Sequence, residues 1–122
     1  MTFKPSIAFR AKAKAGEAMV AAFSKKFGNR LGVSLHTHQG PPLMAWAKIG
    51  SERKETLVLI HGFGDRKESF YFISKFLNET LNLVIPDLPG FGNSGMDPDL
   101  VYSLDNYIDW LGRFIEQNGL DS

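Results

Sequence analysis

The 122-residue sequence predicts an α/β fold with a mostly parallel sheet and helices on both faces. Two short apolar runs, residues 57–60 and 81–85, are rich in branched side chains and too short for ordinary helices, so each predicts a buried strand. A helical pattern follows each run. Strand, helix, strand and helix with short connections indicate parallel strands joined by right-handed crossovers.

The front of the chain, residues 1–31, predicts a basic amphipathic helix and a linker. Residues 6–27 are rich in Ala, with Met19, Phe23 and Phe27 at four-residue spacing and Val20 beside them, and Gly28-Asn29 is a plausible stop. Through Arg30 the chain holds seven basic side chains and one acidic. Two interpretations are open: the helix lies on a lipid headgroup surface as a peripheral membrane contact, or it docks its apolar stripe on its own domain. A basic segment poor in acids is also compatible with an organellar transit peptide.

Two strands are expected next, at residues 32–37, where apolar and polar side chains alternate, and at residues 44–49. His36 and His38 share one face of the first of these strands. Because no third ligand is near and the chain has no Cys, we expect ordinary surface or turn histidines and no metal site. Nothing in the sequence indicates a cofactor.

The run at residues 57–60 ends in His61-Gly62-Phe63-Gly64, which predicts a loop able to bind an anion. Two glycines within three residues let the backbone turn sharply and leave N–H groups pointing outward. Ligands collect beyond the carboxyl ends of parallel strands, so this loop is the first candidate for a site.

The remaining elements repeat this arrangement. Apolar residues from Phe70 to Leu77, with Ile73 and Phe76 between them, fall on one face of a helix that is predicted to reach Asn78 or Glu79. The next strand is stopped by Pro86, and a second glycine-rich loop follows it. Ser103 can cap a final helix that ends before Gly119, and one apolar face of this helix carries Leu104, Tyr107, Ile108, Leu111, Phe114 and Ile115.

The two strand-and-loop motifs together resemble the N-terminal part of the α/β-hydrolase fold family, in particular its esterases and lipases of the monoacylglycerol type. The motifs are Leu-Val-Leu-Ile-His-Gly-Phe-Gly at residues 57–64 and Leu-Val-Ile-Pro-Asp-Leu-Pro-Gly-Phe-Gly-Asn-Ser at residues 83–94, with about twenty residues of helix between them. The resemblance covers residues 32–122, which we interpret as an incomplete domain comprising the first four strands and two helices.

This resemblance implies a role for the first loop in an oxyanion hole. The backbone N–H of Phe63 would be one of two donors aimed at the negative charge on an ester carbonyl oxygen under attack. Gly62 and Gly64 would permit the turn, and His61 would support the loop rather than transfer protons, because the family's base comes from a loop late in the chain. Asp87 would fix the second loop, which carries Gly90 and Gly92, through backbone hydrogen bonds and a charge partner.

Neither Ser94 nor a pair of carboxylates fits the catalytic roles. Gly92-Asn93-Ser94-Gly95 superficially resembles a nucleophile elbow, but Met96 stands where G-x-S-x-G requires Gly. Asp87 paired with Asp97 or Asp99 is a poor candidate, because the family's triad acid follows a later strand.

We therefore expect the N-terminal fragment of a serine hydrolase for carboxylic or lipid esters, lacking nucleophile, acid and base and inactive by itself. Epoxide hydrolases and dehalogenases share the scaffold with an Asp nucleophile. The alternative is a non-catalytic truncated product or interaction module. There is no phosphate-loop motif, no aromatic and basic pattern typical of nucleic-acid binding, and no apolar run of the roughly 18 residues that a membrane span needs. The absence of Cys fits a reducing compartment, so we expect a cytoplasmic protein, with membrane association through residues 6–27 as the open alternative.

Overall fold

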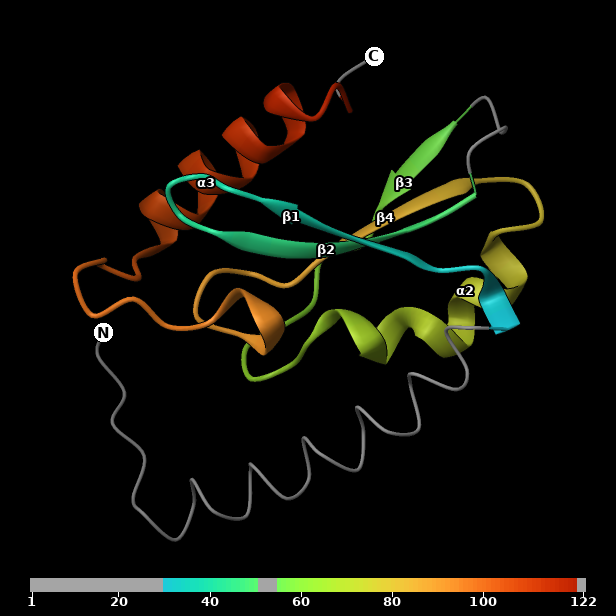
Figure 1. Cartoon of the computed structure of the whole chain (residues 1–122), viewed down its shortest axis with the longest axis horizontal. Helices are drawn as coiled ribbons and strands as arrows, with labels where there is room; N and C mark the ends of the chain where they lie inside the picture. The colour runs from blue at the N-terminus through green and yellow to red at the C-terminus, as the bar shows by residue number, and fades with distance from the viewer. Residues whose placement is uncertain (1–29, 51–54, 121–122) are drawn as a thin grey trace, which may run out of the picture.

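The computed structural model of the protein describes residues 30–50 and 55–120, which contain one mixed sheet with strand order β1-β2-β4-β3 (Figure 1). β3 and β4 are parallel, whereas β2 runs antiparallel to both β1 and β4. The predicted α/β fold is confirmed, and the antiparallel β2 makes the described part of the sheet mixed. The strands are β1 (Ser34–His38), β2 (Met44–Ile49), β3 (Thr56–Val58) and β4 (Asn82–Pro86).

The register of the parallel pair brings the two predicted loops to one edge of the sheet. Leu57 pairs with Leu83 and Val58 with Val84, and the Leu59 N–H donates to the Val84 carbonyl oxygen at 2.9 Å just beyond β3. Both strands therefore release their loops at the same carboxyl edge.

Two helices cover opposite faces of the sheet (Figure 1). Helix α2 (Tyr71–Leu77) packs Tyr71 on one face, in a cluster with Ala47, Ile49, Leu83 and Ile85. Helix α3 (Leu104–Gln117) packs Phe114 on the other face, against Met44, Trp46 and Val84. The alternation of Leu83, Val84 and Ile85 between the two clusters follows from the period of two along a strand. Full burial of each such side chain is worth about 1.5–3 kcal/mol.

Strand β3 is shorter and more exposed than the sequence predicts. It ends at Val58, and Leu57 and Ile60 are exposed, so the prediction of a strand buried on both faces is wrong for the described residues. The reason is its position: β3 lies at the edge of the described sheet and pairs with β4 alone. At the other edge, Leu35 of β1 is also exposed, which differs from the half-buried strand that the sequence predicts at residues 32–37.

Helix α2 buries a different face from the one predicted. Tyr71 and Ser74 are buried, whereas Ile73 and Phe76 are exposed, and only Phe70 and Leu77 of the predicted stripe pack against the core. A 3₁₀ helix, η1 (Lys67–Phe70), precedes α2 and changes the phase at which the α-helical period begins. The small Ser74 side chain, whose hydroxyl donates to the Phe70 carbonyl oxygen at 2.7 Å, lies at the buried face.

Helix α3 begins and ends as its sequence predicts. The Ser103 hydroxyl accepts a hydrogen bond from the Asn106 N–H at 3.2 Å and so caps the N-terminus. Beyond the helix, Gly119 has a φ of 66°, and the N–H groups of Gly119 and Leu120 donate to the carbonyl oxygens of Glu116 and Ile115. This is a Schellman motif. The buried side chains are Trp110 and Phe114, whereas Leu104 and Ile108 of the predicted face are exposed.

The predicted N-terminal helix at residues 6–27 lies outside the described residues, so the two interpretations of it remain predictions. Within residues 30–50 and 55–120, none of the helices has the length and apolar character needed to cross a bilayer.

Candidate functional site

The candidate site consists of two loops at the carboxyl edge of the parallel pair. The first loop, residues 61–66, follows β3, and the second loop, residues 87–95, follows β4. In Figure 1 both loops lie on the side of the sheet from which η1 and α2 also start. The contacts between them determine which groups face outward.

His61 ties the two loops together. Its side chain is buried; Nδ1 lies 2.8 Å from the Gly62 carbonyl oxygen, and Nε2 accepts a hydrogen bond from the Leu88 N–H at 3.0 Å. A carbonyl can only accept and an amide N–H can only donate, so these contacts require a neutral imidazole with its proton on Nδ1. Both ring nitrogens are occupied, which leaves neither for proton transfer in this arrangement.

The glycine turn projects from this attachment. The Asp65 N–H donates to the Gly62 carbonyl oxygen at 3.1 Å, and Gly64 has a φ of 79°, in the region that favours glycine. The Phe63 side chain is 83% exposed, and its ring meets the ring of Phe91 edge to face at 5.5 Å. The same Phe91 ring meets His61 edge to face at 5.5 Å, so the second loop also supports the turn through its aromatic side chain.

Asp87 is the centre of the second loop. Its carboxylate is fully buried and accepts hydrogen bonds from the Lys67 N–H at 2.7 Å and the Asn93 N–H at 2.9 Å. A Cβ at Gly92 would lie 2.3 Å from Asp87 Cγ, so only glycine lets the chain pass this close. Asp87 thus fixes the start of η1 and the turn of its own loop with one side chain.

Lys67 is the charge partner of Asp87, and no pattern in the sequence singles it out. The Lys67 side chain is buried, and its Nζ lies 2.7 Å from Asp87 Oδ2, 2.8 Å from Glu68 Oε1 and 2.7 Å from Asn93 Oδ1. The ammonium donates hydrogen bonds to Asp87 and Asn93 and forms ion pairs with two carboxylates, which compensate its buried charge. Burial, and then the negative charges of Glu68 and Asp87, raise the pKa of the neighbouring Tyr71 phenol, which stays neutral at physiological pH.

The Ser94 side chain holds the second loop in place through two hydrogen bonds. Its hydroxyl donates to the Asp87 carbonyl oxygen at 2.6 Å and accepts from the Ala45 N–H at 2.9 Å, which joins the second loop to β2. Gly90, with a φ of 93°, closes the loop by donating its N–H to the Gly95 carbonyl oxygen at 2.7 Å. The Ser94 side chain is buried, and among the described residues its hydroxyl makes no contact with an imidazole.

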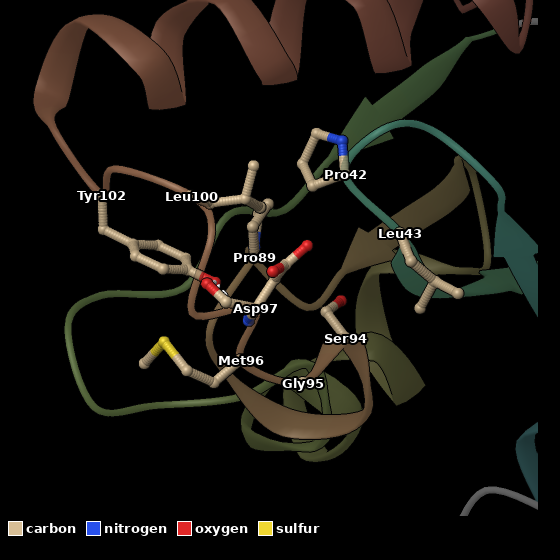
Figure 2. A pocket seen from close by; sticks show the side chains of 9 residues that line it. All are labelled: Pro42, Leu43, Pro89, Ser94, Gly95, Met96, Asp97, Leu100 and Tyr102. Atoms are coloured by element: carbon tan, nitrogen blue, oxygen red, sulfur yellow. Dashed lines mark hydrogen bonds between the residues drawn. The ribbon is translucent and has the colours of Figure 1, made fainter.

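A small pocket lies beside the second loop, with a volume of about 130 Å³ (Figure 2). Ligand pockets usually measure about 300–1,000 Å³, so this one is too small to hold an ester substrate. Tyr102 lines the pocket, and its hydroxyl accepts a hydrogen bond from the Asp97 N–H at 2.8 Å. The side chains around it come from the β1–β2 turn and the segment after β4: Pro42, Leu43, Pro89, Ser94, Gly95, Met96, Asp97, Leu100 and Tyr102.

The two histidines near the start of the described chain pack on aromatic rings. His36 stacks on Trp46 with ring centroids 4.4 Å apart, and His38 meets Phe114 edge to face at 5.6 Å. Asp97 and Asp99 are exposed and lie in the segment between the second loop and α3. Across residues 30–50 and 55–120, no three His, Cys, Asp or Glu side chains are grouped so as to hold a metal ion.

The parallel strands thus end in an exposed glycine turn and in a loop around a buried aspartate. The model of the alpha/beta hydrolase fold family matches residues 55–122, and the chain belongs to that family.

Similar proteins include enzymes of more than one kind. Lipase 3 of a Moraxella species is 39% identical over 79 residues, which cover 65% of this chain and 25% of the lipase. A haloalkane dehalogenase of Bradyrhizobium diazoefficiens is 30% identical over 79 residues, again 25% of its length. The solved structure of a bacterial membrane phospholipase A has a TM-score of 0.75 and 28% identity, covering 93% of this chain and 37% of that one. The chain thus spans about a quarter of the length of these curated relatives.

Proposed function

We propose that this chain is the N-terminal part of a serine hydrolase that acts on carboxylic esters, lipid esters among them, and that it supplies half of the oxyanion hole. The observation that carries the proposal is the glycine turn at residues 62–64, held from the second loop by His61 and by the Phe91 ring. The similarity to lipase 3 and to a phospholipase A supports an ester of a lipid as substrate.

The chemistry assigned to the turn is electrostatic. When a nucleophile attacks an ester carbonyl, the carbonyl oxygen gains negative charge, and the backbone N–H of Phe63 would donate a hydrogen bond to it. One such preorganised donor contributes about 2.7–4 kcal/mol to transition-state stabilisation. The bond from Leu88 to His61 and the ion pair of Lys67 with Asp87 support this role, because a donor fixed in advance needs no reorganisation during the reaction.

The nucleophile, acid and base are assigned to the part of the family's length that this chain does not span. Within the described residues, the Ser94 hydroxyl is bonded within the second loop and to β2. Both nitrogens of His61 are also engaged, one with Gly62 of its own loop and one with Leu88 of the second loop. We therefore expect the 122 residues alone to be inactive. The chain is also similar to a haloalkane dehalogenase, so the alternative to a serine nucleophile is an aspartate nucleophile.

Hydrolysis of a short-chain nitrophenyl ester tests the proposal in two steps. The 122 residues alone should show no turnover, and saturable hydrolysis that disappears in Ser94→Ala would contradict the assignment of Ser94 as structural. The same residues in a polypeptide that continues through a nucleophile elbow should hydrolyse the ester and lose activity on treatment with a fluorophosphonate. Ester hydrolysis that resists this serine-directed reagent would contradict a serine hydrolase.

A further inference from the structure

The first loop, residues 61–66, is attached to the second loop at both of its ends. At its start, His61 Nε2 accepts a hydrogen bond from the Leu88 N–H at 3.0 Å. Directly after its end, the Lys67 N–H donates to Asp87 Oδ1 at 2.7 Å. The glycine turn lies between these two bonds, so both of them restrict the conformations that the turn can adopt.

The bond at the end of the loop depends on a buried ion pair. Lys67 binds one carboxylate twice, because its N–H donates to Asp87 Oδ1 and its Nζ donates to Asp87 Oδ2, each at 2.7 Å. The Lys67 side chain is 2% exposed, and that of Asp87 is fully buried. A buried carboxylate needs a compensating charge and hydrogen-bond donors with good geometry. The ammonium therefore keeps Oδ1 directed at the start of η1.

Asn93 extends the same cluster into the second loop. Its Oδ1 accepts a hydrogen bond from Lys67 Nζ at 2.7 Å, and its N–H donates to Asp87 Oδ2 at 2.9 Å. Asn93 stands two residues after Phe91, whose ring meets the Phe63 ring edge to face at 5.5 Å. The ammonium is thus connected to the glycine turn in two ways, through the backbone at η1 and through the second loop.

We propose that Lys67 is a positioning residue for the backbone N–H of Phe63. Its ammonium, acting through Asp87 and Asn93, holds this oxyanion-hole donor in place. Lys67 itself is buried and acts only through these neighbours. The inference rests on the proposed function for its effect on catalysis. Its effect on the turn belongs to the 122 residues themselves and can be measured without a reaction.

A neutral replacement of the ion pair separates positioning from stability. Lys67→Met with Asp87→Asn, the neutral-pair variant, removes both charges together, and a buried pair replaced in this way often leaves the fold intact. The α3 control, Arg113→Met with Asp109→Asn, removes a different ion pair, whose nitrogen and oxygen lie 2.6 Å apart. Asn93→Ala is a milder variant, because it keeps the buried ion pair and removes one acceptor of the ammonium.

Relaxation of backbone ¹⁵N in the 122-residue chain provides the first test. In the unaltered chain the order parameter of the Phe63 N–H should be about 0.85, the value of a rigid backbone, and in the neutral-pair variant it should fall below about 0.6. Asn93→Ala should give an intermediate value, and the α3 control should match the unaltered chain. The Val84 N–H in β4 should stay rigid in every variant.

Three results of this test would overturn the proposal. A Phe63 order parameter below about 0.6 in the unaltered chain would mean that the turn is not held. An unchanged value in the folded neutral-pair variant would mean that Lys67 contributes stability alone. If the neutral-pair variant does not fold, an unchanged value in Asn93→Ala has the same meaning.

A double-substitution cycle in an ester-hydrolysing polypeptide that contains these residues provides the second test. The neutral-pair variant should lower kcat about 10–100-fold with little change in KM, which is less than the loss of about 10²–10³-fold expected when a donor is removed. In a Phe63→Pro background the same variant should lower kcat no further, because the donor is already absent. An equal loss in both backgrounds would overturn the positioning role.

The two tests also distinguish this proposal from the proposed function. If Phe63→Pro has the same kcat as Phe63→Ala, the N–H of residue 63 is no oxyanion donor and the proposed function fails. The relaxation measurement then still decides whether Lys67 holds the turn, because it involves no substrate.

Discussion

The tripeptide Gly-Phe-Gly occurs twice in this chain, at residues 62–64 after β3 and at residues 90–92 after β4. A Cβ at Gly62 would meet no atom of the described residues within 4 Å, whereas one at Gly92 would lie 2.3 Å from Asp87 Cγ. Phe63 is largely exposed, and Phe91 is half-buried against both Phe63 and His61. The same three residues thus form an open turn in one loop and close over a buried carboxylate in the other.

The difference has a physical cause. The second loop contains a buried charge, and a buried charge must be surrounded by hydrogen-bond partners at fixed positions. The first loop contains no buried charge, and its shape depends on attachments to the second loop through His61 and Phe91. We infer that the second loop is the support and the first loop is the part that meets substrate.

The largest expected effect is the loss of the buried charge at the centre of the second loop. Asp87→Ala leaves the buried Lys67 without its main partner and removes acceptors from two backbone N–H groups, so the free energy of unfolding should fall by about 3–5 kcal/mol. Urea unfolding followed by tryptophan fluorescence measures this change. Asp87→Asn, which keeps one acceptor oxygen, should cost less, and an equal loss in both variants would argue against the importance of the acceptor.

The two Gly-Phe-Gly copies can be compared directly by adding one methyl group to each. Gly92→Ala forces a contact with Asp87 at a φ of 51° and should lower the free energy of unfolding by about 2–4 kcal/mol. Gly62→Ala, in open space, should change it by about 0.5 kcal/mol or less. Similar losses at both positions would contradict the distinction between an open turn and a support.

Ser94→Ala tests the structural role of a serine whose surroundings only superficially resemble a nucleophile elbow. The substitution leaves the Ala45 N–H and the Asp87 carbonyl oxygen without this partner, so it should cost about 1–3 kcal/mol of stability. Unchanged urea unfolding would show that the hydroxyl does not join the second loop to β2 in solution.

The smallest expected effect concerns the connection between α3 and the second loop. The Tyr107 hydroxyl donates to the Pro89 carbonyl oxygen at 2.6 Å, and burial, with a smaller contribution from Tyr102, raises the pKa of Tyr107 to about 12. Because the pKa is higher in the folded than in the unfolded chain, this contribution to stability is complete below pH 10 and is lost as the pH rises to 12. Tyr107→Phe should therefore make the fall in stability between pH 10 and 12 shallower, and an unchanged slope would contradict the raised pKa.

The sequence predicts those features whose cause is local. The Ser103 cap, the glycine after α3 and the position of both loops depend on a few neighbouring residues and on strand period, and the structure contains them. The family resemblance, which rests on the spacing of the two loops, is confirmed by the match to residues 55–122.

Features that depend on contacts distant in sequence were missed. Lys67 stands in the polar run Asp65-Arg-Lys-Glu-Ser69 and looks like a surface residue, because its partner Asp87 is twenty positions away. The prediction of the buried face of α2 is wrong because η1 shifts the residue at which the α-helix starts. The spacing of apolar residues does not reveal this shift. The exposure of Leu57 and Ile60 follows from the place of β3 in the sheet order, and apolar content alone does not show that place.

We propose that the first loop acts through the backbone N–H of Phe63. The most direct measurement compares Phe63→Pro with Phe63→Ala in an ester-hydrolysing polypeptide that contains these residues. Both variants lack the exposed ring, and only proline also lacks the N–H. We expect kcat of Phe63→Pro to fall about 10²–10³-fold below that of Phe63→Ala, with little change in KM or melting temperature. Equal kcat values in the two variants would contradict it.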